Sequence, residues 1–498
     1  MEDSEILDRF LKSNINLHPS ALEEIKRSPN VHETVDKIIS QVAGGADAPE
    51  VITREFLRGV ARPIKTRKPS LPSSRPRRIP LAAEYDAELS IKDEKDITRK
   101  SFTQGDIESF RDYFRDRFEG LARILRERNN LRDSYNIEWV KNKKGSEVQL
   151  VVMVSDIRKS KKGHVILEVE DHSGSMPVLI LNNDPDLQEI AKEIVLDEVI
   201  GVVGSVSRNG EIIIARDILF PDIPVSRTPR RSEAPLGLTI ISDIHVGSTK
   251  FLEGVFLKFL KWLRGEMGSA KQRLLAEKVK YLIVGGDLVD GVGIYPGQEN
   301  ELLIKDIREQ YTRFASFLGM VPDHVEIIVL PGNHDAVRQA EPQPAIGEEF
   351  AAELYEDPRV HMVGNPCYAS VSGVEVLSYH GRSLDDIIST IPNQSYSKPE
   401  KAMLMLIRKR HLTPIYGGKV PLAPEDRDYM LIEDVPDILH LGHVHTVGVE
   451  NYRGTMLINS GTFQSQTTFQ RKMNMQPHPG EIPVVDLMEG RATVMRFM

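Results

Sequence analysis

The 498-residue sequence has one cysteine, Cys367, so it cannot form an intramolecular disulfide. No apolar run approaches the roughly 20 residues that a membrane-spanning helix needs. A general excess of basic residues is also missing, because the formal net charge is −9 at pH 7. Any contact with nucleic acid must therefore come from local basic patches or from bound metals. These absences predict a soluble, cytoplasmic protein, and the length is sufficient for two or three domains.

Five polar clusters stand at the ends of apolar runs between Ile241 and His445. The runs read LGLTIISD, KYLIVGGD, VEIIVLPGNHD, VEVLSYHG and DILHLGHVH, and each is typical of a buried strand. Open α/β sheets bind ligands at the rim where the strands end. We therefore expect the polar side chains to converge there on a metal site. The candidate metal ligands are Asp243, His245, Asp287, Asn333, His380, His443 and His445.

Two metal ions fit this donor set better than one. Seven oxygen and imidazole donors exceed the four that a tetrahedral zinc site uses. A carboxylate such as that of Asp287 can bridge two cations about 3.5–4 Å apart, an arrangement that suits displacement at phosphorus. Because no cysteine takes part, the donors favour Mn²⁺, with Mg²⁺ or Fe²⁺ as alternatives.

The order of the clusters, D-x-H, GD, GNHD, H and GHxH, resembles that of the calcineurin-like metallophosphoesterases. A lone GD turn or a lone buried histidine has an ordinary structural explanation, but five such clusters in this order do not. The resemblance implies a four-layer α/β/β/α domain over residues 236–498. It also implies that His334 acts as a general acid or a transition-state stabiliser. One implied metal set is Asp243, His245, Asp287 and His445, and the other is Asp287, Asn333, His380 and His443.

A narrower resemblance lies in the run GNHDAVRQAEPQP and in SYHGRS, together with a β-rich module upstream. These features closely resemble the small subunits of archaeal family D DNA polymerases. The resemblance implies a 3′→5′ proofreading exonuclease that acts on DNA 3′ ends and pairs with a large polymerising subunit as a heterodimer or higher assembly. The alternatives are a stand-alone repair nuclease or phosphodiesterase of the same superfamily, and a non-enzymatic polymerase accessory subunit.

Two arginines follow these motifs closely. Arg338 and Arg382 are candidate phosphate-binding residues, because a planar guanidinium can hold two phosphate oxygens. Ordinary ion pairing on the protein surface is the competing explanation for both.

The sequence upstream divides into three parts. Residues 1–45 have amphipathic stripes that predict a helical module, which is either a docking module or a solvated appendage. Residues 46–100 include a basic, proline-rich stretch that predicts a flexible linker, and this stretch either contacts DNA or is merely solvated. Residues 101–220 predict a helix followed by an OB-fold.

The OB-fold prediction rests on five strand signals between Glu147 and Arg216, with a helical segment between the third and the fourth. This module lacks an evident ladder of aromatic residues on which bases would stack. DNA binding and protein docking therefore both remain open for the barrel.

Overall fold

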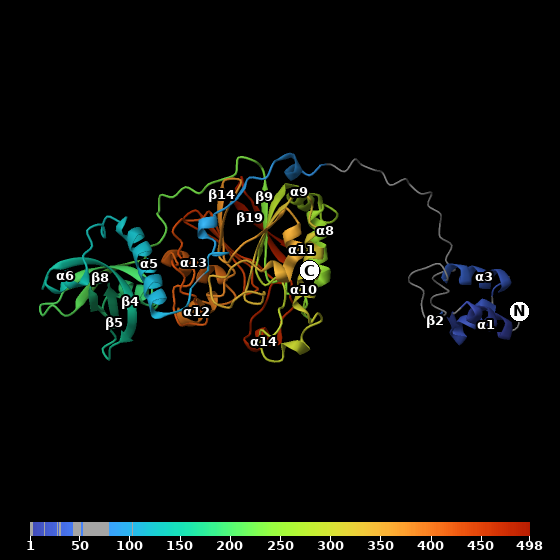
Figure 1. The fold of residues 1–498 in the computed structure, drawn as a ribbon, viewed down its shortest axis with the longest axis horizontal. Coiled ribbons are helices and arrows are strands. Elements are labelled where there is room, and N and C mark those ends of the chain that lie inside the picture. Colours follow the sequence, from blue (N-terminus) through green and yellow to red (C-terminus); the bar gives the residue numbers. More distant parts are fainter. Residues whose placement is uncertain are drawn as a thin grey trace. The chain divides into compact units, whose positions relative to one another are not determined.

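The computed structural model describes residues 3–13, 15–26, 28, 31–42, 51–52, 79–101 and 103–498. The chain forms two compact units, Met1–Arg78 and Ile79–Met498 (Figure 1). Residues 53–78, which hold most of the basic, proline-rich stretch, lie outside the described residues, so the tether expected there stays a prediction. Within the described ranges, every helix is too short or too polar to cross a membrane.

Among its described residues, the N-terminal unit contains three short helices and one short pair of parallel strands. Its small core includes Ile6, Phe10, Ile25 and Val35, which recur at helical spacing along one face of each helix. A docking role for this unit stays a prediction. The elements are α1 (Asp3–Lys12), β1 (Asn16–Leu17), α2 (Pro19–Lys26), α3 (Val31–Val42) and β2 (Val51–Ile52).

A closed five-stranded barrel follows the first helices of the second unit, which confirms the expected OB-fold. The strand order is β4-β5-β6-β8-β7, with α7 between the third and fourth strands in sequence. Alternate side chains such as Leu150, Val152 and Val202 point into the barrel, where they are fully buried. The elements are α5 (Ile107–Arg126), α6 (Ile137–Lys141), β4 (Glu147–Lys159), β5 (Val165–Asp171), β6 (Gly174–Ile180), α7 (Pro185–Ala191), β7 (Val199–Val206) and β8 (Ile213–Leu219).

The remainder of the unit is built on two six-stranded mixed sheets. The first has the order β12-β11-β10-β9-β18-β19 and the second the order β16-β17-β15-β14-β13-β3. The first sheet contains β9 (Gly237–Ile241), β10 (Val279–Gly285), β11 (Glu326–Leu330), β12 (Val360–Met362), β18 (Glu481–Asp486) and β19 (Arg491–Arg496). The second contains β3 (Leu89–Ile91), β13 (Cys367–Val371), β14 (Val374–Ser378), β15 (Ile438–Leu441), β16 (Gly448–Tyr452) and β17 (Thr455–Asn459).

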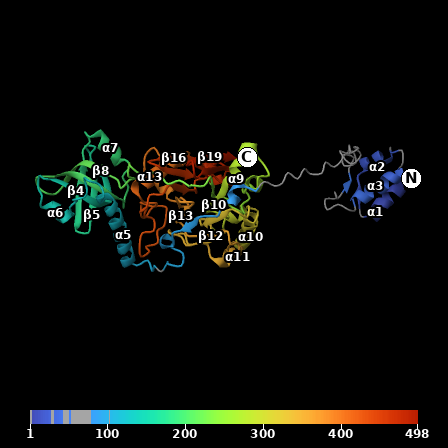
Figure 2. The same ribbon diagram turned by 90° about the horizontal axis from the view of Figure 1, so that it is seen from above.

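These sheets pack face to face, because one apolar cluster contains Ile240 and Ile283 from the first sheet and Val376 and Ile458 from the second. Helices cover both outer faces, as Figures 1 and 2 show. The layers are therefore α/β/β/α, as expected. The helices are α8 (Glu253–Leu263), α9 (Ala270–Lys278), α10 (Ile307–Leu318) and α11 (Glu348–Glu356) on one side, and α12 (Leu384–Thr390) and α13 (Pro399–Lys409) on the other.

The flexible linker expected over residues 46–100 is wrong for its last part. Residues 79–101 fold onto the two-sheet domain, where β3 pairs with β13 in antiparallel register, Ser90 opposite Ser370. The Asp96 carboxylate accepts a hydrogen bond from the Gly364 backbone at 3.0 Å. A three-residue edge strand is too short to show a periodic pattern, so composition alone gave a misleading prediction here.

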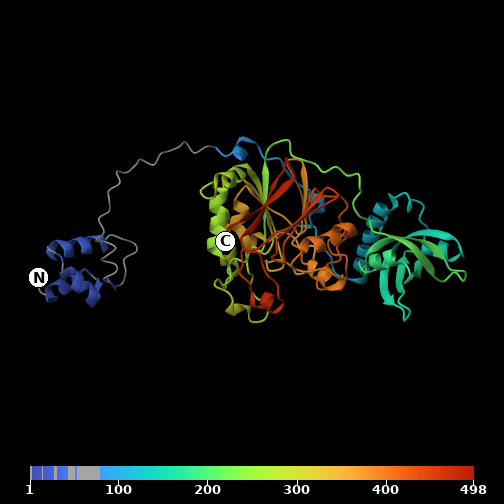
Figure 3. The same cartoon turned by 180° about the vertical axis from the view of Figure 1, so that it is seen from behind.

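Two buried ion pairs join the barrel region to the two-sheet domain, and Figure 3 shows the barrel beside α13. Arg117 of α5 lies 2.9 Å from Asp428, and Glu198 directly before β7 lies 2.7 Å from Lys409 at the end of α13. All four side chains are almost completely buried. Because a buried charge is stable only beside its partner, these pairs fix how the two domains meet.

Candidate metal centre

The predicted ligands stand where strands of both sheets end. Asp243 and His245 follow β9, Asp287 follows β10, and Asn333 follows β11. These three strands run parallel in the first sheet. In the second sheet β14 and β15 are also parallel, and they lead to His380, His443 and His445. Because parallel strands end at the same edge, both sheets deliver their polar side chains to one place.

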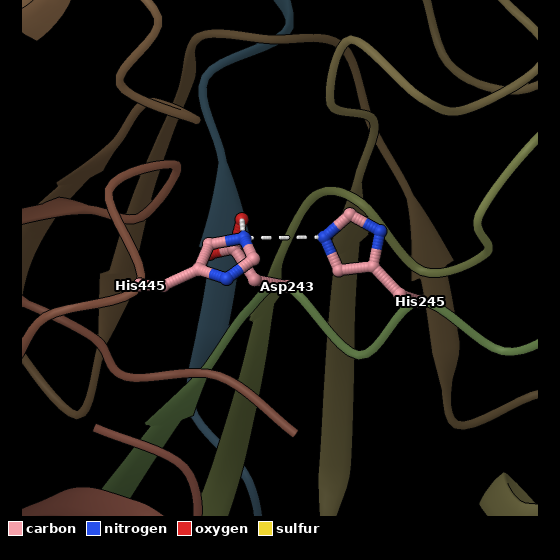
Figure 4. Close-up of side chains that lie close together, drawn as sticks. All are labelled: Asp243, His245 and His445. Atoms are coloured by element: carbon pink, nitrogen blue, oxygen red, sulfur yellow. Dashed lines mark hydrogen bonds and ion pairs between the residues drawn. The ribbon is translucent and has the colours of Figure 1, made fainter. Parts of the chain in front are cut away.

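The structure brings all seven predicted ligands and His334 together. The donor atoms form three groups, and within each group they lie within 4.8 Å of one another. The groups are Asp243, His245 and His445; His245, Asp287 and His334; and Asp287, His380 and His443. Figure 4 shows the first group. Asn333 joins the third group, since its Oδ1 lies 3.1 Å from His380 Nε2. Asp287 belongs to two groups, with its Oδ2 3.4 Å from His380 Nε2 and 3.7 Å from His245 Nε2.

The backbone of these clusters adopts an uncommon conformation. Five of the site residues have positive φ angles, a region that residues other than glycine rarely occupy. Each such residue costs on the order of 1–3 kcal/mol and persists only where the surrounding structure holds it, often at functional sites. The five are Asp243 at 53°, His245 at 55°, Asp287 at 51°, His443 at 68° and His445 at 59°.

Gly332 shows how closely the loops approach each other. A Cβ atom at this position would lie 2.3 Å from Asp287 Oδ1 and 2.5 Å from the Asp287 backbone nitrogen. Only glycine lets the loop after β11 reach the shared carboxylate. The glycine of the GNHD cluster is thus required by packing at the site itself.

Whether these donors fit a cation can be tested by asking which of their buried polar atoms form no hydrogen bond. Asp243 Oδ1 is buried and, among the described residues, accepts no hydrogen bond. His445 Nε2 lies 3.3 Å from this oxygen without forming a hydrogen bond, and a bound cation would supply the interaction that the buried oxygen lacks. The donors are imidazole, carboxylate and amide groups, which suit divalent metals. The residues therefore fit a metal site.

The ionisable groups of the site interact strongly with one another. Burial disfavours protonation of His380, but the carboxylates of Asp287 and Asp243 outweigh it and raise the pKa of His380 to about 10. Burial also disfavours ionised Asp243, yet His445 and His380 lower its pKa to about 2. Asp243 is thus ionised beside a protonated His380, and a cation that binds these donors would release the His380 proton.

The centre opens into a cleft of about 530 Å³. Its floor includes Asp287, Asn333 and His334. Its walls include Tyr295, Lys419, Phe469 and Met473. The volume lies within the roughly 300–1,000 Å³ typical of small-ligand sites.

Comparison with known proteins gives the family. Residues 238–447 match the B-subunit family of DNA polymerases alpha and epsilon, and residues 148–218 match the OB-fold nucleic acid binding domain. A DNA polymerase II small subunit from Archaeoglobus fulgidus is 43% identical over 480 residues, which cover 96% of this chain and 95% of the relative. The chain belongs to the family of archaeal DNA polymerase II small subunits.

Other small subunits give similar matches. The protein from Methanothermobacter thermautotrophicus is 39% identical over 490 residues, covering 97% of this chain and 98% of the relative. The protein from Methanocaldococcus jannaschii is 41% identical over 408 residues, covering 82% of this chain and 68% of the relative. The similarity to the first two relatives includes the N-terminal unit, the barrel and the two-sheet domain.

Several side chains that orient the donors in this small-subunit site were not predicted. Gln470 donates to His445 Nδ1 at 2.9 Å, and Asp385 Oδ2 lies 3.3 Å from His443 Nε2. Asp290 places its Oδ1 3.1 Å from His245 Nδ1. The two carboxylates can fix the tautomer and the ring orientation of their histidines, and Gln470 holds the orientation of the His445 ring. Asp290, three residues after Asp287, could have been noticed in the sequence, whereas Gln470 and Asp385 carry no local signal.

The predicted phosphate contacts of the two arginines are not supported by the geometry. Arg338 lies 2.7 Å from Glu425 and also donates to the Pro342 carbonyl at 2.9 Å. Arg382 donates to the Gln339 carbonyl at 3.0 Å. Neither arginine lines the cleft within the part of the chain that the structure describes, but Lys419 does.

Proposed function

We propose that this chain is the 3′→5′ proofreading exonuclease subunit of an archaeal family D DNA polymerase. The observation that carries the proposal is the sharing of Asp287 by two groups of buried donors at the floor of an open cleft. Family membership supplies the context, since the relatives are small subunits of DNA polymerase II. The large subunit implied by that name would carry out polymerisation.

In the proposed centre, Asp287 belongs to both metal sets. Asp243, His245 and His445 complete one set, and Asn333, His380 and His443 complete the other. Two divalent cations held by these residues, Mn²⁺ in the first instance, would activate water and offset the charge that develops on the phosphate oxygens. Asp290 lies 3.1 Å from His245 Nδ1, so it can accept the proton of that nitrogen and leave Nε2 available to a cation, whereas Gln470 donates to His445 Nδ1. The Nε2 atoms of the two rings lie 3.2 Å apart.

His334 is proposed to move a proton rather than to bind metal. Its Nδ1 donates to the Asp290 carbonyl at 2.8 Å, so this nitrogen is already committed. The protonated ring then carries its second proton on Nε2. His334 lines the cleft, and its Nε2 would donate to the departing 3′-oxygen of the penultimate nucleotide. The released product would be a nucleoside 5′-monophosphate.

The test uses the full chain and a primer with a mismatched 3′ end. With Mn²⁺ we expect release of nucleoside 5′-monophosphates, faster from the mismatched primer than from a fully paired one, and no release in the presence of a chelator. Failure to release nucleotides with Mn²⁺, Mg²⁺ or Fe²⁺ would instead favour an accessory subunit. Hydrolysis of cyclic nucleotides without any action on primers would favour a small-molecule phosphodiesterase.

The partner is tested separately. Co-expression with the large subunit of the same polymerase should give one complex in size-exclusion chromatography. If the two chains elute separately at micromolar concentration while the primer is still degraded, the chain acts as a free-standing nuclease.

A further inference from the structure

An apolar wall stands at the mouth of the cleft. Phe469 and Met473 lie in or next to α14 (Thr468–Lys472), and they are 66% and 54% exposed. Single exposed apolar residues are common and need no explanation. These two, however, both line the cleft that holds the metal donors, and a clustered apolar surface in a concave site is typical of ligand binding.

The segment that carries this wall is attached to the metal centre. Gln470, between the two exposed residues, is buried and donates from Nε2 to His445 Nδ1 at 2.9 Å. Its Oε1 accepts from the Thr467 backbone at 3.0 Å, which completes a capping box at the start of α14. Gln466 holds the far end of the segment through the Met475 carbonyl at 2.8 Å. The backbone of α14, which carries Phe469, is therefore anchored beside His445.

The rest of the cleft mouth supplies an aromatic ring and a positive charge. Tyr295 is 39% exposed, donates to Glu301 at 3.0 Å, and has its ring centroid 6.5 Å from that of His334. Lys419 is exposed and lines the same cleft. An anionic group is attracted to the metal donors with their cations and to Lys419, whereas a flat apolar group is attracted to Phe469. A nucleotide has both parts, a phosphate and a base.

We propose that Phe469, supported by Met473, stacks against the unpaired base of the 3′-terminal nucleotide while its phosphate lies over Asp287. The proposal rests on the exonuclease function and names what that site recognises. An aromatic face stacks on any base, so recognition would not depend on sequence. A terminal base must leave its partner to reach the wall, and this costs least for a mismatched base. The wall would thus contribute to the choice of mismatched ends.

The experiment compares two p-nitrophenyl phosphodiesters that differ only in the group retained on phosphorus. One is the p-nitrophenyl ester of thymidine 5′-monophosphate, which has a base, and the other is methyl p-nitrophenyl phosphate, which has none. The quantity measured is the ratio of their kcat/KM values with the full chain and Mn²⁺. Phe469→Ala should lower this ratio about 5- to 150-fold, since stacking is worth about 1–3 kcal/mol per base and each 1.36 kcal/mol is tenfold. Phe469→Trp should restore it.

Leu274→Ala is the matched control, because Leu274 of α9 is 53% exposed and does not line the cleft. It should leave the ratio as in the wild type. An equal fall of kcat/KM on both substrates in Phe469→Ala, or no fall on either, would overturn the proposal.

A binding measurement separates this proposal from the exonuclease function. Fluorescence anisotropy with a labelled pentathymidylate and a chelator reports base contacts without catalysis. Weaker binding by Phe469→Ala than by Leu274→Ala supports the wall even if the wild type hydrolyses neither ester, in which case only the proposed exonuclease function is lost. Equal binding by the two variants counts against the wall.

Discussion

Replacing Arg117 with methionine is expected to weaken the junction between the barrel region and the two-sheet domain. The Arg117 side chain is fully buried, with Nε 2.9 Å from Asp428 Oδ2. Its other nitrogens donate to the Pro414 carbonyl at 2.9 Å and to the Tyr113 hydroxyl at 2.9 Å. Methionine has a similar length but no donor, so it leaves the Asp428 charge without its arginine partner.

The expected loss in the free energy of unfolding depends on which partners Asp428 keeps. Removing one partner of a buried ion pair typically costs about 3–5 kcal/mol, because the other charge stays buried. His411 Nε2, 2.7 Å from Asp428 Oδ2, still offers one hydrogen bond and reduces this loss. We therefore expect Arg117→Met to lower the free energy of unfolding by about 3 kcal/mol. The double variant with Asp428→Asn should cost less than the sum of the two single changes, since the contact is shared.

The control is Arg123→Met on the same helix. Arg123 is largely exposed and lies 3.3 Å from Glu433, and surface pairs of this kind are worth about 0–1 kcal/mol. Urea unfolding of the full chain gives the change in midpoint, and hydrogen exchange of the α5 amides reports the junction directly. If Arg117→Met destabilises the protein no more than Arg123→Met, the buried pair does not hold the domains together.

Asp287→Ala should lose metal and nuclease activity together, because it removes a donor from both sets, whereas His334→Ala should keep its metal and lose about 10²–10⁴-fold in rate. Metal analysis beside primer kinetics checks this, and loss of metal by His334→Ala would contradict the assignment. Cys367 is buried, and burial raises the pKa of its thiol, so it should not react with a thiol reagent until the chain unfolds; rapid labelling of the native protein would contradict its burial. Burial disfavours ionised Asp428, but His411 and Arg117 outweigh it and lower its pKa below the ordinary value of 3.8. The ionised Asp428 carboxylate therefore stabilises the protein above about pH 4, and this stabilisation is lost as the pH falls further. Between about pH 5 and about pH 3, the urea midpoint of the wild type should fall more than that of Asp428→Asn.

The donor set could be predicted from sequence because each donor follows directly on an apolar strand. Histidines such as His443 and His445 have little packing value at a strand end, so their type and position already indicate a ligand site. The five strand signals between Glu147 and Arg216, with a helical segment between the third and the fourth, likewise predict an OB-fold barrel. Both predictions use information that lies within a few residues along the chain.

Other features depended on segments that are distant in the sequence. The Gln470 contact with His445, the Phe469 wall of the cleft and the pairing of β3 with β13 have no local signal. In the sequence Arg338 resembles a phosphate ligand, whereas in the fold it forms an ion pair with Glu425. Positive φ angles at residues such as Asp287 are likewise imposed by the packed loops around them and not by the residue types.

The sequence by itself thus determined which atoms can bind metal and on which strands they stand, since these follow from residue type and from periodicity along the chain. Only the tertiary structure decided which donors share Asp287, which partners orient the histidines, and which apolar side chains face the cleft. The physical reason is that a local pattern fixes the direction of a side chain relative to its own strand or helix, whereas the neighbours that it meets depend on how the sheets, helices and loops pack together.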